Sequence, residues 1–336
     1  MRQDDAVSLP GRAPRPRRGR APAAAPGHAR TIAHWIARTL ATDPPRARSL
    51  IVTVWGDALA PHDGRVWLAS LIRLMAPFGL SDRLVRTSVF RLARDGWVAG
   101  ETHGRRSRYR LTSEGARRFA QAHQRIYAPA DAAWSGDWEM VIVPPDAAGA
   151  AQRQALREEL AWEGFATIAP ATLARPAHGE SPTQRIVTAL GLAPAAMVLH
   201  VRDDPGAAST LAARAAAAWP LRALAADYRR LIGRFGTVID RFRDTPDHLD
   251  PEQCFVVRTL LIHAYRRVLL RDPQLPASLL PPDWPGAAAY ALTRDFYRLT
   301  HAVAERHLAA TCAADGDALP PADAAFYARF GGLVDG

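Results

Sequence analysis

A group of arginines in the N-terminal third of the chain has the spacing of a nucleic-acid contact surface. Between residues 82 and 94 the apolar side chains recur at helical intervals, which predicts a helix with one buried face. The side chains left on its other faces are Arg83, Arg86, Thr87, Phe90 and Arg91. A guanidinium can pair with two acceptors on guanine, and an apolar side chain can contact the methyl group of thymine. The pattern predicts a surface that binds duplex DNA, with Arg83, Arg86, Thr87 and Phe90 as the candidates for contacts with base edges.

A second basic cluster lies at the tip of a predicted β-hairpin. Its members are Arg105, Arg106, Ser107 and Arg108. The flanking strand-like runs cover residues 97–102 and 107–112, and Gly104 in the connection has the chemistry of a turn. We expect these side chains to contact phosphates or an adjacent minor groove, where they position the protein and do not specify sequence.

Two further predicted helices place both clusters in one domain. Apolar side chains at helical intervals predict helices over residues 50–59 and 66–75. A tight connection then leads to Ser81, which suits the N-cap of the arginine-rich helix. Three helices followed by a hairpin form the winged variant of the helix-turn-helix, whose second motif helix lies in the major groove. We predict this domain over residues 46–118.

The charge of the chain is concentrated in the same region. Residues 1–125 contain 23 arginines and 9 acidic side chains, a balance of +14, whereas the remainder has a balance of −4 within the total of +10. A localised positive charge favours a polyanionic partner such as double-stranded DNA. Residues 1–30 are rich in Pro, Gly, Ala and Arg and lack an apolar period, so we expect a disordered basic arm there.

Composition also bounds the class of protein. No run of about 18 uncharged apolar residues occurs, so we expect no membrane partner. Cys254 and Cys312 lack the spacing of a metal site, which suits a reducing compartment. We therefore expect a cytoplasmic protein without a bound metal.

The rest of the chain predicts two further domains. Strand-like runs at residues 138–143, 165–169 and 197–202 alternate with helical runs at 153–162 and 185–190. We assign this small α+β unit to residues 128–205. Helical signals dominate afterwards, over residues 221–242, 251–270 and 287–308, and we assign a mostly helical domain to residues 210–330. The fold class we expect is α+β and multidomain.

Several motifs, taken in this order, resemble the PaaX family of bacterial transcriptional repressors, which regulate phenylacetic acid degradation. The N-terminal landmarks are Arg48-Ser49-Leu50-Ile51, Gly56-Asp57, Phe78-Gly79-Leu80-Ser81, Val85-Arg86-Thr87, Arg91 to Trp97, and Gly104 to Ser107 with Tyr109 to Thr112. Those further on are Trp134 to Trp138, Glu159 to Phe165, Arg258 to Arg267, and Leu270 to Gly286. At the position of Phe90 the family more often has a small residue such as Ser.

This resemblance implies the roles of the domains. The middle domain is expected to be ferredoxin-like, similar to the CRISPR-associated Cas2 fold, and to make the protein a homodimer. The C-terminal domain is expected to respond to an effector, an aryl-acyl-CoA such as phenylacetyl-CoA, whose binding relieves repression; no other cofactor is implied. Phosphates and an acyl tail would require cations and an apolar wall. The candidates for effector binding are Arg258, His263, Tyr265, Arg266, Arg267 and Trp284.

An enzyme is the alternative class, although the sequence contains no GxSxG elbow, phosphate-binding loop, HExxH helix or dinucleotide fingerprint. We therefore expect no enzymatic activity. A Cas2-like domain nevertheless raises a metal-dependent nuclease as the specific alternative, with Asp137 as the candidate ligand. A scaffold or RNA-binding module would need aromatic platforms that the sequence does not display.

Overall fold

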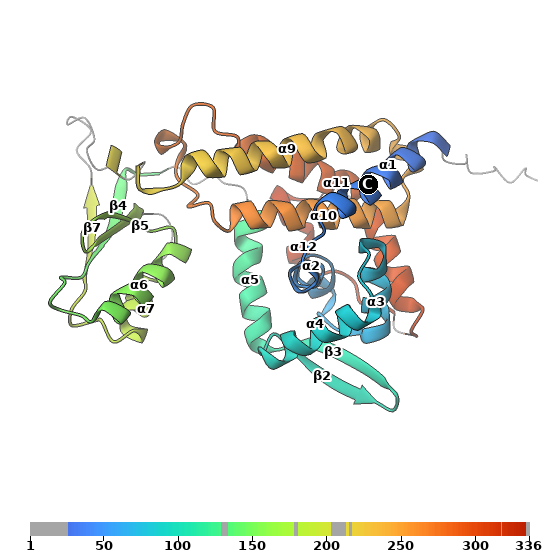
Figure 1. Ribbon diagram of the computed structural model, residues 1–336, viewed down its shortest axis with the longest axis horizontal. Helices are drawn as coiled ribbons and strands as arrows, with labels where there is room; N and C mark the ends of the chain where they lie inside the picture. Colours follow the sequence, from blue (N-terminus) through green and yellow to red (C-terminus); the bar gives the residue numbers. More distant parts are fainter. Residues whose placement is uncertain are drawn as a thin grey trace, which may run out of the picture.

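The computed structural model describes residues 26–128, 134–177, 181–202, 213–214, 217–316 and 318–333. The elements form a small α/β domain on one side and a larger body on the other, in which the N-terminal helices lie against the C-terminal ones (Figure 1). Within the described part, no helix is both long and apolar enough to span a bilayer. The expected α+β, multidomain fold is confirmed.

The winged helix-turn-helix forms as predicted, with small shifts at its boundaries. Its helices are α2 (Ala47–Val54), α3 (Leu68–Met75) and α4 (Asp82–Arg94), joined by a π-helical turn, η1 (Trp55–Leu59), and the 3-10 turns η2 (Ala60–His62) and η3 (Ala76–Phe78). Strands β2 (Val98–His103) and β3 (Arg106–Leu111) form the wing, and α5 (Ser113–Tyr127) leads away from it. Val66 and Trp67 were predicted as helical and instead form strand β1, which extends the wing sheet in the order β1-β3-β2.

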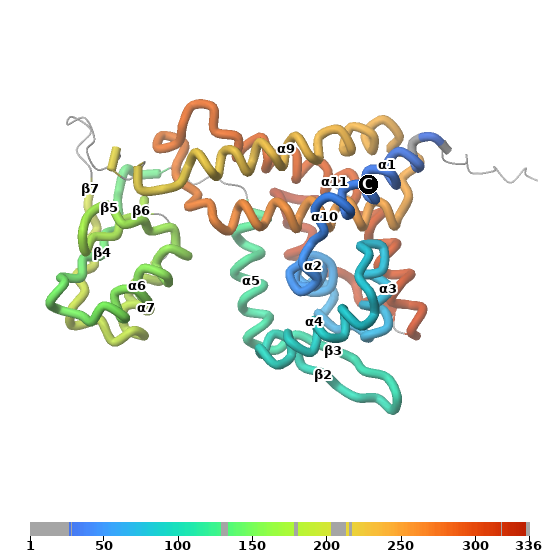
Figure 2. The backbone as a smooth tube through the Cα atoms, in the orientation of Figure 1, coloured from blue at the N-terminus to red at the C-terminus, as the bar shows by residue number. Residues whose placement is uncertain are grey.

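The prediction of a disordered basic arm over residues 1–30 is partly wrong. Residues 1–25 lie outside the described residues, whereas residues 26–30 begin helix α1 (Pro26–Thr42), which the sequence interpretation missed. Ile32 and Trp35 bury one face of α1, which lies against α9 and α10 from the far end of the chain (Figure 2).

The middle domain has the ferredoxin-like topology that the resemblance implied. Its elements are β4 (Asp137–Ile142), α6 (Ala150–Trp162), β5 (Ala166–Ala169), β6 (Thr172–Pro176), α7 (Thr183–Ala189) and β7 (Met197–Arg202). The sheet has the order β5-β6-β4-β7 with antiparallel pairs throughout. Strand β6 was not predicted. Val141, Leu156 and Leu160 lie in the core between the sheet and the helices.

The C-terminal domain is helical, as predicted. It contains α9 (Leu221–Arg243), α10 (Pro251–Leu269), α11 (Gly286–Ala313) and α12 (Ala324–Tyr327), with short 3-10 turns η4 (Pro246–His248), η5 (Ala277–Leu279) and η6 (Arg329–Gly331). Buried side chains on every side of α10 explain its place at the centre of the body, against α2, α9 and α11.

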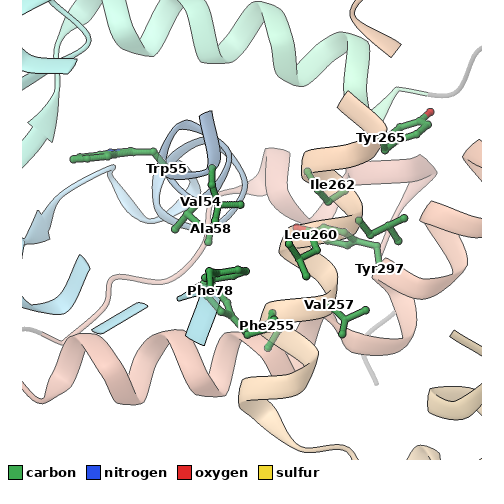
Figure 3. Close-up of a cluster of buried hydrophobic side chains, with 14 of the residues drawn as sticks. Val54, Trp55, Ala58, Phe78, Phe255, Val257, Leu260, Ile262, Tyr265 and Tyr297 are labelled. Carbon is green, nitrogen blue, oxygen red and sulfur yellow. The ribbon is translucent and has the colours of Figure 1, made fainter. Parts of the chain in front are cut away.

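One hydrophobic core joins the winged helix to the C-terminal domain. Val54 of α2 and Ala58 of η1 lie in the same core as Leu260 and Ile262 of α10 (Figure 3). The ring of Phe78 lies 6.1 Å from that of Phe255, measured between centroids. Because apolar burial is continuous across this boundary, displacement of α10 or α11 would disturb the packing of the winged-domain helices.

Candidate nucleic-acid interface

Helix α4 presents a polar, basic surface because its core-facing residues are those predicted from the sequence. Val85, Ser88, Val89 and Leu92 are buried. The Ser81 hydroxyl accepts a hydrogen bond from the backbone N–H of Leu84, which fixes the start of the helix. Of the predicted contact residues on α4, all five are exposed: Arg83, Arg86, Thr87, Phe90 and Arg91. Phe90 is 66% exposed, so burial in the core does not account for this aromatic side chain.

Arg86 differs from its neighbours because it already has a partner. Its Nε donates to Oδ1 of Asp82 at 2.5 Å, one turn earlier on the same helix. Both side chains are more than half exposed, so the pair is weak and exchangeable. Arg83 and Arg91 have no such ion pair within the described residues and present their charges directly.

Two further α4 side chains were not predicted as contacts. Leu84 is 44% exposed near the start of the helix, and Arg94 is exposed at its end. The helical periodicity that places Val85 and Val89 in the core also places Leu84 and Arg94 outward, so both could have been predicted from the sequence. Leu84 and Phe90 are two exposed apolar side chains among the cations of α4.

The wing is a β-hairpin with a two-residue turn. His103 pairs with Arg106, and Gly104 occupies the turn with a φ of 61° that favours glycine. Arg105 is exposed beside it and has no ion pair within the described residues. Ser107 and Arg108 are partly buried in β3, and the Arg108 guanidinium lies 5.4 Å from the centroid of the Trp67 ring. Of the predicted wing residues, Arg105 and Arg106 are therefore the exposed ones.

Arg106 is held within the molecule. Its guanidinium stacks on Trp67 at 4.1 Å from the ring centroid, and its Nη2 donates to the backbone carbonyl of Asp315 at 2.6 Å. The Asp315 carboxylate lies 3.4 Å from the same nitrogen. Half of the Arg106 side chain remains exposed.

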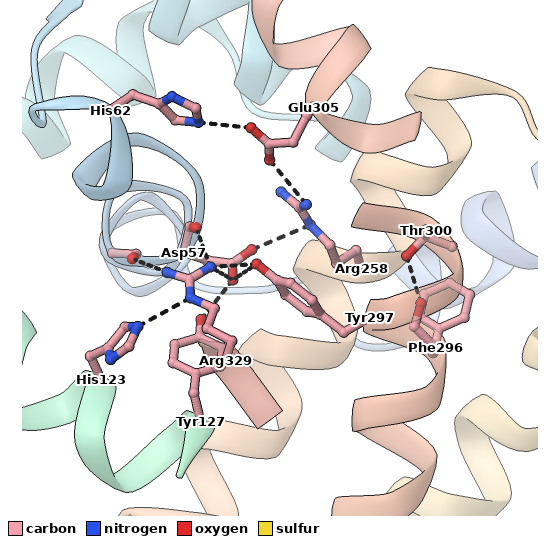
Figure 4. Close-up of polar contacts among 11 residues, drawn as sticks. Asp57, His62, His123, Tyr127, Arg258, Phe296, Tyr297, Thr300, Glu305 and Arg329 are labelled. Carbon is pink, nitrogen blue, oxygen red and sulfur yellow. Dashed lines mark hydrogen bonds and ion pairs between the residues drawn. The ribbon is translucent and has the colours of Figure 1, made fainter. Parts of the chain in front are cut away.

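A buried ionic network ties the winged helix to the C-terminal domain (Figure 4). Asp57 lies in the π-helical turn η1 and is 1% exposed. Its carboxylate faces the guanidinium groups of Arg258 at 3.5 Å and Arg329 at 3.3 Å. It also accepts hydrogen bonds from the hydroxyls of Tyr127 at 2.6 Å and Tyr297 at 3.0 Å. Two buried cations sharing one carboxylate need a second acid to balance them.

Glu305 supplies that second charge. Its carboxylate accepts a hydrogen bond from Arg258 at 3.1 Å and lies 2.7 Å from Nε2 of His62. The other His62 nitrogen lies 2.6 Å from the carbonyl oxygen of Pro320. Although burial opposes the charged form, these two acceptors raise the pKa of His62 above its ordinary value. The network thus connects η1 and η2 to α10, α11 and the C-terminal segment.

Comparisons with known proteins match all three domains. Residues 46–115 match the family described as PaaX-like protein, residues 131–213 the PaaX protein central Cas2-like domain, and residues 219–310 the PaaX-like protein C-terminal domain. The chain is 32% identical over 291 residues to the transcriptional repressor PaaX of Escherichia coli (strain K12), covering 86% of this chain and 92% of that protein. The chain belongs to the PaaX family.

The chain is also similar to a solved structure. The uncharacterized protein Rv0674 from Mycobacterium tuberculosis superposes with a TM-score of 0.52 at 28% sequence identity, over 79% of this chain and 98% of that one.

The effector residues inferred from the PaaX resemblance fall into two groups. Arg258, His263 and Tyr265 are buried, and Arg258 is fully enclosed between Asp57 and Glu305. His263 Nδ1 lies 2.8 Å from the Thr53 hydroxyl, and burial lowers the pKa of this imidazole to about 3. These three side chains join α10 to its neighbours and present no group at the surface, which differs from the expectation.

The remaining three candidates are more open. Arg267 is exposed, Trp284 is partly exposed and packs edge-on against Tyr228, and Arg266 donates to the Ser49 carbonyl oxygen at 3.2 Å. Arg266 also borders a cavity of about 30 Å³ between α2, α5 and α10. A cavity of this volume suits one or two water molecules and is far too small for a CoA thioester.

Asp137, the candidate ligand of the nuclease alternative, is engaged in an ion pair. Both carboxylate oxygens accept hydrogen bonds from Arg202, at 2.7 and 3.1 Å. Hydrogen bonds from Arg202 and Ser135 hold the pKa of Asp137 at about 2. Over the described ranges, no three His, Cys, Asp or Glu side chains gather as a metal site would require. Asp137 therefore acts as the acidic partner of a cross-strand pair.

Proposed function

We propose that this chain is a DNA-binding transcriptional repressor of phenylacetate-type catabolic genes, acts in the cytoplasm, and has no enzymatic activity. The observation that carries the proposal is the basic, exposed face of α4 in a winged helix-turn-helix, in a chain that belongs to the PaaX family. Helix α4 enters the major groove, where Arg83, Arg86, Thr87 and Phe90 contact base edges. The wing and Arg91 contact phosphates.

A binding assay on duplex DNA tests this function. Fluorescence anisotropy compares the region upstream of the protein's own coding sequence with a scrambled duplex of equal length and at equal salt. Arg86→Ala should weaken binding to the upstream duplex by about 1–3 kcal/mol and leave the scrambled duplex nearly unaffected, because base contacts carry the specificity. Asp82→Asn is the matched control, since it removes the partner of Arg86 and keeps the guanidinium. Absence of a preference for the upstream duplex, together with metal-dependent cleavage, would favour the nuclease.

The effector we propose is an aryl-acyl-CoA such as phenylacetyl-CoA, bound by the C-terminal domain. Support for a response comes from the continuous core and the Asp57 network, which couple α10 and α11 to the DNA-binding helices. Among the candidate residues, Arg267 and Trp284 are accessible to the thioester. Phenylacetyl-CoA should release the upstream duplex, whereas free CoA should not. Arg267→Ala should reduce that release without changing the affinity for DNA in the absence of thioester.

A homodimer through the middle domain completes the proposal, because winged-helix repressors commonly read two related half-sites. Met197 and Leu199 of β7 are 47% and 41% exposed and lie on the sheet face opposite α6 and α7. Ile142 pairs with Met197 and Met140 with Leu199. Met140 also packs against an internal cluster that contains Trp219, so the exposed apolar surface suited to a second copy is formed by Met197 and Leu199. Leu199→Glu should shift the sedimentation coefficient to that of a monomer; a native chain that sediments as a monomer at micromolar concentration would refute the dimer.

A further inference from the structure

Asp315, two residues beyond the end of α11, contacts both the wing and helix α3. The Asp315 carboxylate accepts hydrogen bonds from the Ser70 hydroxyl and from Nη2 of Arg73, the latter at 2.6 Å. Arg73 Nη2 also donates to the Thr311 carbonyl oxygen at 3.2 Å, so α3 is fixed to the last turn of α11. In Figure 1 the C-terminal end of α11 lies beside α3, on the side of the body from which the wing projects.

Arg106 is bound at the same point by groups that resemble those of a phosphate. Two acceptor oxygens of Asp315, one carbonyl and one carboxylate, face a single guanidinium nitrogen at 2.6 and 3.4 Å. Burial of the acid favours its neutral form, but hydrogen bonds from Ser70 and Arg73 outweigh this and keep the pKa of Asp315 below its ordinary value. The carboxylate is therefore charged at neutral pH, and only 13% of its side chain is exposed.

We propose that Asp315 is a positioning residue that restrains Arg106 in the free protein, and that DNA binding replaces Asp315 by a backbone phosphate at this arginine. The exchange is possible because about half of the Arg106 side chain faces solvent. The Trp67 ring holds the guanidinium plane in place while its hydrogen-bond partner changes. Through this contact Asp315 controls how many positive charges of the wing are available to DNA phosphates. The inference rests on the proposed DNA-binding function.

The restraint predicts how the salt dependence of binding responds to substitution. Each additional phosphate contact steepens the fall of log affinity with log salt by about 0.9 on duplex DNA. Asp315→Asn keeps the shape and the carbonyl but removes the charge that competes for Arg106. We expect this variant to bind upstream and scrambled duplexes more tightly at low salt, up to about fivefold, with a slope steeper by up to about 0.9.

The experiment is an anisotropy titration over a salt series with the full chain, its Asp315→Asn, Arg106→Ala and double variants. The double variant should lose both the gain in affinity and the added slope. Asp240→Asn is the matched control, because this acid pairs with Arg243 on the exposed surface of α9 and its removal changes the net charge equally. Circular dichroism and thermal unfolding establish that each variant is folded.

The outcomes separate this inference from the function on which it rests. A native chain that binds neither duplex would overturn the DNA-binding function itself. A native chain that binds while Asp315→Asn leaves the slope unchanged, or weakens binding, would overturn only the restraint. A gain that persists in the double variant, or that Asp240→Asn reproduces, would show a general charge effect and would also overturn it.

Discussion

Replacing Asp57 tests whether the winged helix and the C-terminal domain form one structural unit. Asp57→Ala leaves Arg258 and Arg329, both with fully buried side chains, without their shared carboxylate. It also removes the acceptor of two buried tyrosine hydroxyls. Removing one member of a buried ion pair typically costs about 3–5 kcal/mol because an uncompensated charge remains in the interior. Glu305 still opposes Arg258, so we expect the lower part of this range.

The loss is measurable by thermal unfolding. An unfolding entropy of about 2 cal/mol/K per residue over the whole chain converts about 3 kcal/mol into a decrease of about 4 °C in the melting temperature. Asp240→Ala, which removes an exposed carboxylate from α9, is the control and should cost less than about 1 kcal/mol. If Asp57→Ala lowers the free energy of unfolding no more than this control does, the network does not stabilise the body as argued.

Three further predictions concern pH and DNA recognition. Protonated His62 stabilises the fold because its pKa is raised on folding. The native chain should therefore have a larger free energy of unfolding than His62→Gln, with the full difference below about pH 6.5 and a smaller one as the pH rises through the folded pKa. A difference in urea unfolding that widens toward pH 9 would contradict this. Phe90→Ala should weaken binding to the upstream duplex by about 1 kcal/mol for each lost thymine methyl contact, and should cost nothing on a duplex in which uracil replaces thymine. An equal loss on both duplexes would exclude methyl recognition. Arg105→Ala should weaken binding to upstream and scrambled DNA alike and reduce the salt slope by about 0.9; a loss confined to the upstream duplex would instead make Arg105 a base contact.

Helix α4 was predictable because its determinants are local. The spacing of Val85, Val89 and Leu92 defines the buried face, and Ser81 provides the cap one turn before it. Both signals lie within a few residues of the side chains that they position. The ferredoxin-like domain needed the family resemblance, because periodicity alone missed the short strand β6, which ends at Pro176.

The links between domains were not predictable from spacing. Arg329 contacts Asp57 across a separation of 272 residues, and nothing in either local sequence indicates the partner. Arg258 was expected to face a ligand because it is a cation in a helix that resembles the family's effector domain. The structure instead encloses it between two acids, since α10 is buried on all sides. For Arg106 the sequence predicted only a contact with DNA. Its contact with Asp315 depends on the long-range packing of α11 against α3.

The affinity ratio between the upstream duplex and the scrambled duplex, measured for the native chain and for Arg83→Ala, tests the central claim most directly. Arg83 is exposed on α4 and has no ion pair within the described residues, so its loss should not alter the fold. If α4 reads base edges, the ratio should fall by the factor that corresponds to about 1–3 kcal/mol of binding free energy, while binding to scrambled DNA changes little. A ratio that stays the same, with both duplexes weakened equally, would contradict the assignment of α4 as the element that recognises sequence.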